Sequence, residues 1–167
     1  MQFTSAQQPA VKTWLTNNAS GQSDDASAAL LNANASPDFW IWRSLVPETE
    51  IYQLTTADGT TWNWTTYIGR NQAERDAWRQ MVSGRNAGLV TALPNVRQAI
   101  ADIFSGAGGA NQRTHLLTIG RRKATVLEKL LASGTGSTAV PADMGIGSDG
   151  GYSEGHITDG QVAEIRG

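Results

Sequence analysis

The feature that most constrains this chain is an abrupt change of composition at Gly134. Residues 134–167 hold nine of the eighteen glycines of the chain and few large apolar side chains. Such a segment cannot bury enough apolar surface to fold in isolation. We therefore expect two parts: a helical domain over 1–134, and an extended glycine-rich C-terminal arm over 135–167 that docks on a partner.

The arm keeps two patches of side chains suited to docking, 140–144 and 156–165. The second patch alternates well enough to add as a strand to the edge of another sheet. The expected contact residues of the arm are Val140, Pro141, Met144, Ile146, Tyr152, His156, Ile157, Val162 and Ile165.

Before Gly134, apolar side chains recur mostly at helical spacing, which predicts a mainly α fold built as a helical bundle. Ser23 is a good N-terminal cap, and Pro94 is typical of a first helical turn. The expected helices cover the segment around Trp14, a stretch capped by Ser23, Glu48 to about Leu54, Arg70 to Ser83, and Pro94 to Gly106.

The longest helix is expected over 111–133, where Leu116, Gly120, Ala124 and Leu127 fall on one face. A glycine inside a helix is costly, so we expect Gly120 to allow a close approach by a packed neighbour. One segment, 55–64, predicts a small β-hairpin, because Asp58-Gly59 suits a tight turn between threonines and tryptophans.

The sequence offers little for catalysis. It has no cysteine and only two histidines, no nucleophile-elbow motif, and no apolar run long enough to span a membrane. The loop Gly106–Gly109 follows a predicted helix rather than a strand and lacks the lysine of a phosphate-binding loop. We expect a protein that is not an enzyme, holds no metal or other cofactor, and has no membrane partner.

Charge is unevenly distributed along the chain. Residues 70–133 carry ten basic and four acidic side chains, whereas the segments on either side are acidic. The basic candidates on the expected long helix are Arg113, Arg121, Arg122 and Lys123. They suit a solvated helix face, non-specific contact with DNA phosphates, or docking of an acidic segment from a neighbouring copy.

The tryptophans of FWIWR and TWNWT alternate in two W-x-W pairs. Large aromatic residues form the core of small helical proteins, and they also anchor subunit interfaces and sugar-binding platforms. We interpret Trp40, Trp42, Trp62, Trp64 and Trp78 as core residues, with an interface as the first alternative and sugar binding as the second.

Four segments resemble one family of small virion proteins encoded among the head and neck genes of tailed bacteriophages. They are SPDFWIWRSLVPETEI, DGTTWNWTTYIGRNQAERDAW, NVRQAIADIFSGAGG and QRTHLLTIGRRKATVLEKLLASGTGSTAVPADM, within residues 35–145. The resemblance implies a head-to-tail adaptor (connector), a ring that joins the portal to the tail. The sequence GIGSDGGYSEGHITDG in the arm departs from the family pattern.

The resemblance further implies a helical bundle whose extended C-terminal arm grips the portal protein, with the opposite face turned to a tail or nozzle protein. About twelve copies would form a homo-oligomeric ring beneath a dodecameric portal, since repeated heterologous contacts close rings. The basic helix would line or flank the DNA channel at the neck of the virion. The alternatives are a capsid decoration or head-completion protein, and a nucleic-acid-binding regulatory protein.

Overall fold

The computed structural model describes residues 3–53, 59–84, 87–132, 134 and 156–167. It is mainly helical, as expected. The chain divides into two compact units, and the division differs from the expected boundary at 134. Unit 1 combines Met1–Ile41 with Lys123–Gly167, and unit 2 is the continuous segment Trp42–Arg122. Two short strands, β1 (Trp40–Trp42) and β4 (Arg121–Lys123), pair as a two-stranded sheet.

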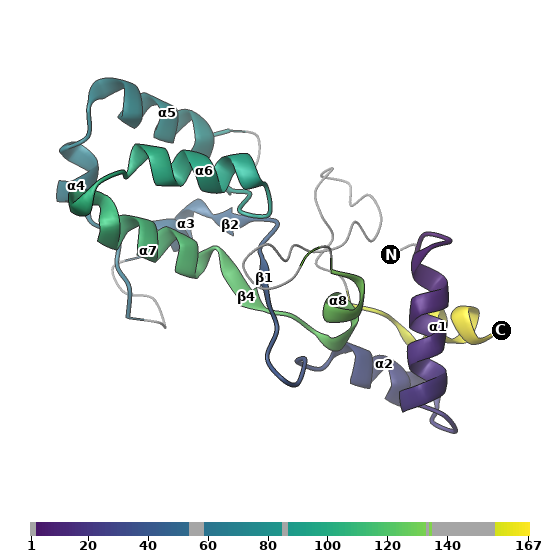
Figure 1. Cartoon of the computed structure of the whole chain (residues 1–167). Coiled ribbons are helices and arrows are strands. Elements are labelled where there is room, and N and C mark those ends of the chain that lie inside the picture. The colour runs from purple at the N-terminus through teal and green to yellow at the C-terminus, as the bar shows by residue number, and fades with distance from the viewer. Residues whose placement is uncertain (1–2, 54–58, 85–86, 133, 135–155) are drawn as a thin grey trace. The chain divides into compact units, whose positions relative to one another are not determined.

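Unit 1 contains α1 (Gln7–Asn18), α2 (Asp24–Asn32), α8 (Val126–Leu131) and α9 (Asp159–Arg166). The Ser23 hydroxyl caps α2 by accepting a hydrogen bond from the Ala26 amide, as the sequence predicts. The first and last helices of the chain lie in this one unit (Figure 1). Its buried core consists of Val11, Leu15, Ala19, Ala28, Leu31, Leu127, Ile157, Val162 and Ile165.

Unit 2 contains β2 (Val46–Pro47), α3 (Glu48–Ile51), α4 (Trp64–Ile68), α5 (Gln72–Val82), β3 (Gly88–Leu89), α6 (Pro94–Ile103), η1 (Ala107–Gly109) and α7 (Ala110–Ile119). Helices α5, α6 and α7 pack in succession (Figure 1). Its buried core consists of Val46, Ile51, Trp62, Tyr67, Trp78, Val82, Leu89, Ile100, Ile103, Phe104, Leu116 and Ile119.

Strands β2 and β3 pair antiparallel, with Val46 opposite Leu89 and Pro47 opposite Gly88. A Cβ atom at Gly88 would lie 2.2 Å from the Val46 carbonyl oxygen, so only glycine fits there. This pairing joins distant segments and is not the expected hairpin. In the described part of 55–64, residues 59–63 form no strand and α4 begins at Trp64. The Asn63 amide donates instead to the Gln112 side chain on α7, at 2.8 Å.

The expected long helix over 111–133 is wrong, because it is divided into α7, β4 and α8. The Gly120 carbonyl accepts hydrogen bonds from the Arg43 amide at 2.9 Å and from the Thr91 hydroxyl at 2.8 Å, which ends α7. A neighbour does pack closely on Gly120, since a Cβ atom there would lie 2.9 Å from Thr91 Cγ2, but the glycine lies at the end of α7 and not inside a helix. Thr125 then starts α8 with a capping box.

The expected strand over 156–165 is also wrong, because residues Asp159–Arg166 form α9. The Thr158 hydroxyl and the Gln161 side chain make a capping box at its start. Val162 and Ile165 are three positions apart, so both lie on the helix face that packs into unit 1. This end of the expected arm is therefore part of a folded unit of its own chain.

Candidate functional site

The centre of unit 2 is an aromatic cluster of six rings: Tyr52, Trp62, Trp64, Tyr67, Trp78 and Phe104. Trp62 lies at its middle, with ring centroids 4.8 Å from Tyr52 and 5.2 Å from Trp78. Trp78 Nε1 donates a hydrogen bond to the Tyr52 hydroxyl at 3.2 Å. The interpretation of Trp62 and Trp78 as core is confirmed, because each is at most 5% exposed.

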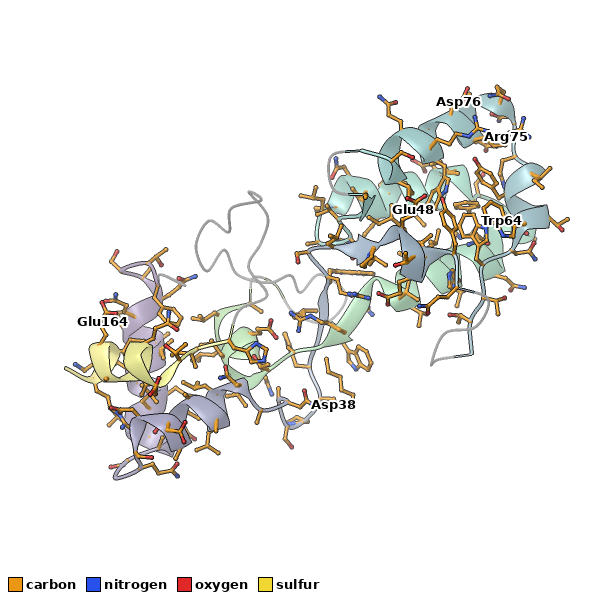
Figure 2. All side chains as sticks on the ribbon, turned by 180° about the vertical axis from the view of Figure 1, so that it is seen from behind. Asp38, Glu48, Trp64, Arg75, Asp76 and Glu164 are labelled. Atoms are coloured by element: carbon orange, nitrogen blue, oxygen red, sulfur yellow. The ribbon has the colours of Figure 1, made fainter. Side chains whose placement is uncertain are left out.

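Trp64 belongs to the same cluster, yet 49% of it is exposed (Figure 2). Its ring stacks on Tyr52 at 5.2 Å with an interplanar angle of 24°, and its edge meets Trp62 at 5.4 Å. Ile68, one helical turn later on α4, is 62% exposed. Together they place two large apolar side chains side by side on the surface.

The Trp64–Ile68 surface is rigidly supported. Asn63 Oδ1 accepts from the Thr66 amide at 2.9 Å and caps the start of α4. At its end, the Arg75 guanidinium donates to the Ile68 carbonyl at 3.0 Å. A half-exposed tryptophan held by stacked rings loses little conformational entropy on binding, which is the property of an interface anchor. The arrangement therefore suits contact with another protein.

The first W-x-W pair, like the second, has one buried and one exposed tryptophan. Trp42 is 6% exposed, whereas Trp40, on β1, is 44% exposed. The Lys123 ammonium lies 6.0 Å from the Trp40 ring centroid and pairs with Asp38 at 2.7 Å. In each pair, one tryptophan ring is buried in the core and the other is on the surface.

The four basic candidates do not share one helix face. Arg113, on α7, donates to the carbonyls of Phe104 and Gly106 and so closes the end of α6. Arg121 lies over the Trp42 ring, with Cζ 4.3 Å from the centroid. Lys123 is engaged by Asp38, and Arg122 is half-buried. Arg113 and Lys123 therefore each have partners within the folded chain: backbone carbonyls for Arg113 and a carboxylate for Lys123.

The expected contact residues of the arm fall into two groups. Val140, Pro141, Met144, Ile146 and Tyr152 lie outside the described residues. His156 is exposed at the entry to α9, whereas Ile157, Val162 and Ile165 are buried in unit 1. The side chain of Asn32 holds Ile157 by both backbone groups, accepting from its amide at 2.9 Å and donating to its carbonyl at 2.8 Å.

Arg166 is an anchoring residue that the sequence analysis missed. Its guanidinium donates to the carbonyls of Gln22 and Ala19, both at 2.9 Å. It also donates to Asp24 Oδ1 at 2.5 Å and to Ser27 Oγ at 2.8 Å. These contacts tie the last turn of α9 to the start of α2, across 142 positions of sequence.

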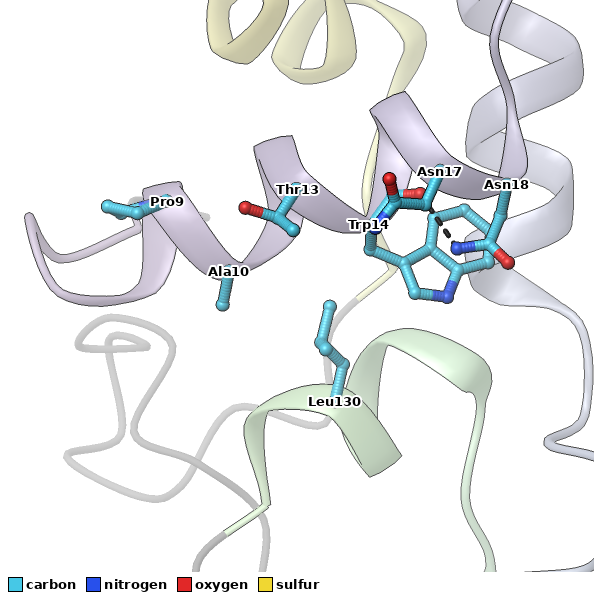
Figure 3. Close-up of a pocket in the computed structure, with 7 residues that line it drawn as sticks. All are labelled: Pro9, Ala10, Thr13, Trp14, Asn17, Asn18 and Leu130. Atoms are coloured by element: carbon cyan, nitrogen blue, oxygen red, sulfur yellow. Dashed lines mark hydrogen bonds between the residues drawn. The ribbon is translucent and has the colours of Figure 1, made fainter.

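Unit 1 carries a shallow apolar groove of about 470 Å³ along α1 (Figure 3). Trp14 and Leu130 face each other across it, one from α1 and one from α8. Its remaining lining residues are Pro9, Ala10, Thr13, Asn17 and Asn18. Four of these residues are apolar and three are small and polar, which suits a weak hydrophobic contact.

His115 is fully buried on α7, and both nitrogens of its ring contact groups of the fold. Its Nε2 lies 2.9 Å from the Ile51 carbonyl and donates to it, and its Nδ1 lies within hydrogen-bond distance of the Thr60 hydroxyl, at 3.1 Å. Within the described residues, no group of histidines and carboxylates is placed to hold a metal ion. In the same part of the chain, no helix is long and apolar enough to cross a membrane.

Comparison of the chain with protein-family models, with curated proteins and with solved structures finds no match. The functional interpretation therefore rests on the residues themselves and on the surfaces described above.

Proposed function

We propose that this chain is a structural virion protein of a tailed bacteriophage, forming the ring that joins the portal to the tail. The observation that carries the proposal is the resemblance of the segments within residues 35–145 to head and neck proteins. The exposed Trp64–Ile68 surface supports a role in binding other proteins, since a preorganised aromatic anchor is typical of an interface hot spot.

In this proposal the chain acts by contact rather than by catalysis. The Trp64–Ile68 surface of unit 2 is the anchor for a protein of the neck, such as the tail or nozzle protein. Residues Val140, Pro141, Met144, Ile146 and Tyr152 are assigned to the portal. Unit 1 holds the chain on both sides of this segment, because α8 and α9 both contribute to its core.

The position of α9 determines how the portal contact should be tested. A truncation after Gly134 would remove Ile157, Val162 and Ile165 from the core of unit 1 and damage its fold. A double substitution, Val140→Asp with Met144→Asp, changes the assigned portal segment and leaves α9 in place. The matched control is Ala29→Asp with Thr16→Asp, which adds the same charge at exposed positions of unit 1.

The test is co-purification of the full-length chain with the portal ring of its own phage, followed by particle averaging. We expect a stoichiometric ring of this protein on the portal with the wild-type chain and the control, and none with the double variant. Binding to coat-protein shells instead of portal would identify a decoration protein and overturn the proposal. Binding to neither assembly would overturn it as well.

A further inference from the structure

Two arginines of unit 2 share one buried indole ring. The Cζ atoms of Arg97 and Arg121 lie 4.8 Å and 4.3 Å from the ring centroid of Trp42, which is 6% exposed. Arg97 comes from α6 and Arg121 from β4, so the fold brings together three segments that are distant in sequence. We call these two side chains the guanidinium pair. Each gains cation–π attraction, yet the two like charges repel each other.

The guanidinium pair lacks a counter-charge within the described residues. Arg97 donates to the carbonyls of Thr91 and Ala92, at 2.6 Å and 2.9 Å, which are neutral acceptors. Arg121 has a buried Nε with no hydrogen-bond partner. Burial, followed by the nearby charge of Arg121, lowers the pKa of Arg97. By contrast, Arg43 in the same unit pairs with Glu50 at 2.5 Å.

An arginine stays charged at neutral pH. Two half-buried guanidinium groups without a negative partner are therefore energetically unfavourable, and binding an anion would lower that cost. The guanidinium group presents paired N–H donors that match the two oxygens of a carboxylate. The buried Nε of Arg121 is out of reach of another molecule. Its terminal N–H groups donate no hydrogen bond within the described residues and lie near the charge of Arg97, so they favour an anionic group supplied from outside unit 2.

The charges of the two units indicate where that anion comes from. Unit 2 carries nine basic and six acidic side chains, whereas unit 1 carries four basic and nine acidic ones. In unit 1, exposed carboxylates on packed helices α2 and α9 form no ion pair within the described structure: Asp25, Asp159 and Glu164 (Figure 2 labels Glu164). We call this the acidic surface. An acidic chain overall is a poor match for DNA, but its two units are complementary to each other.

We propose that the guanidinium pair binds a carboxylate on the acidic surface of a second copy of this chain. The contact is heterologous, since unit 2 of one copy meets unit 1 of the next, and repetition of such a contact closes a ring. The inference assigns the contact between neighbouring copies in the ring. Its biological setting rests on the proposed function. Self-association itself is measurable without the portal.

The first measurement is sedimentation velocity of the full chain over a range of concentrations at low ionic strength. We expect concentration-dependent association that weakens as salt is added, because the contact is between charges near the surface. Arg121→Gln removes one member of the pair without breaking a hydrogen bond between described residues, and it should weaken association by about tenfold or more. Arg79→Gln is the matched control, with the same loss of charge at an exposed position paired with Asp76.

A mixing experiment distinguishes this head-to-tail contact from a symmetric one. The Arg121→Gln protein retains the acidic surface, and a protein with Asp25→Asn and Glu164→Gln retains the guanidinium pair. The second protein also carries Asp159→Asn, so that all three carboxylates of the acidic surface are removed. Each protein alone should stay largely monomeric. Mixed together, they should form heterodimers that grow no further, because only one intact contact is available. A symmetric contact through the guanidinium pair would give homodimers of the second variant and would overturn the inference.

The remaining outcomes separate this inference from the proposed function. A wild-type chain that stays monomeric at every concentration and salt level overturns the contact, as does equal association of the Arg121→Gln and Arg79→Gln proteins. Loss of DNA binding in Arg121→Gln with unchanged self-association would assign the pair to nucleic acid instead. A complete ring of Arg121→Gln protein on the portal would overturn the contact while the adaptor function stands. Self-association through this contact without portal binding would support the contact and overturn the adaptor function.

Discussion

The two units are held together in different ways. Unit 2 is one continuous segment whose core contains an aromatic cluster, with stacked and edge-on rings around Trp62. Unit 1 is assembled from the two ends of the chain, and polar groups fix the last helix in place. Asn32 holds Ile157 across 125 positions, and Arg166 holds the start of α2.

Because of this difference, the two units depend on the C-terminal helix α9 to different degrees. Closing a long loop costs entropy, but the cost grows slowly with length, so a few well-placed contacts suffice to retain α9. Those contacts are specific to single residues, whereas an aromatic cluster distributes its energy over many neighbours. We therefore expect unit 1 to be sensitive to loss of α9 and unit 2 to be insensitive to it.

The largest expected effect comes from ending the chain after Gly155. This change removes three buried apolar side chains, each worth roughly 1.5–3 kcal/mol, so unit 1 should lose most of its stability. Amide hydrogen exchange is the measurement: protection should disappear in α1 and α2 and persist in α5, α6 and α7. Retained protection in α1 would mean that α9 is dispensable and that the two units do not differ in this way.

The second prediction concerns the aromatic cluster. Trp78→Ala should destabilise unit 2 by about 3–5 kcal/mol, because Trp78 is 1% exposed and contacts both Trp62 and Phe104. Loss of exchange protection should be confined to α5, α6 and α7, with α1 and α2 unaffected. Equal loss in both units would show that they unfold together.

Trp64→Ala provides the matched comparison within the same cluster. Its ring is half-exposed, so the change should cost less than Trp78→Ala: it removes the ring contacts with Tyr52, Trp62 and Tyr67, each worth roughly 0.5–1.5 kcal/mol. If Trp64 anchors a neck protein, affinity for that partner should fall by about tenfold or more while the fold is retained. Pull-down with purified tail or nozzle protein tests this. Unchanged binding would leave Trp64 without the proposed role.

The third prediction concerns the polar contacts of unit 1. Arg166→Ala should destabilise unit 1 by roughly 2 kcal/mol, since hydrogen bonds to a charged group are worth about 1.5–3 kcal/mol. The nearby Lys12→Ala variant is the control, because Lys12 is exposed and its one hydrogen bond within the described residues goes to the backbone carbonyl of Arg166, at 3.2 Å. Thermal unfolding followed by circular dichroism compares the two. Equal effects would remove Arg166 from its anchoring role.

Much of the secondary structure could be predicted because its causes are local. The cap at Ser23 and the proline at the start of α6 act within a few residues, and the helices they begin are present. The close approach at Gly120 was predicted for a glycine inside a helix, but Gly120 directly follows Ile119, the last residue of α7. The break of the helix there could not be predicted, because the groups that bind the Gly120 carbonyl belong to Arg43 and Thr91, far away in sequence.

The candidate sites were less predictable for the same reason. A W-x-W pattern does not distinguish Trp62, which is buried, from Trp64, which is exposed, because the backbone there follows no strand. The shared ring of Arg97 and Arg121 requires three segments to meet, which no local pattern indicates. The short helix α9 follows a glycine-rich segment, and its capping box was the one signal that could have revealed it.

The smallest expected effect is a pH dependence confined to unit 2. Burial raises the pKa of Tyr52, and the effect of the Trp78 hydrogen bond, which lowers it, is smaller. A raised pKa in the folded state means that the neutral phenol is favoured by folding. This contribution is complete below the unfolded pKa, near 10, and is lost as pH rises through the folded value.

Unit 2 should therefore lose stability above about pH 10 through this residue, whereas unit 1, whose described residues include no tyrosine, should lose none from this cause. Denaturant unfolding at pH 9 and pH 11, followed separately by exchange in α1 and α5, makes the comparison. Tyr52→Phe removes the titrating hydroxyl, so its unit 2 should change less over this range than the wild-type unit. An equal alkaline loss in the variant would assign the effect to other groups and leave the environment of Tyr52 without influence on the stability of unit 2.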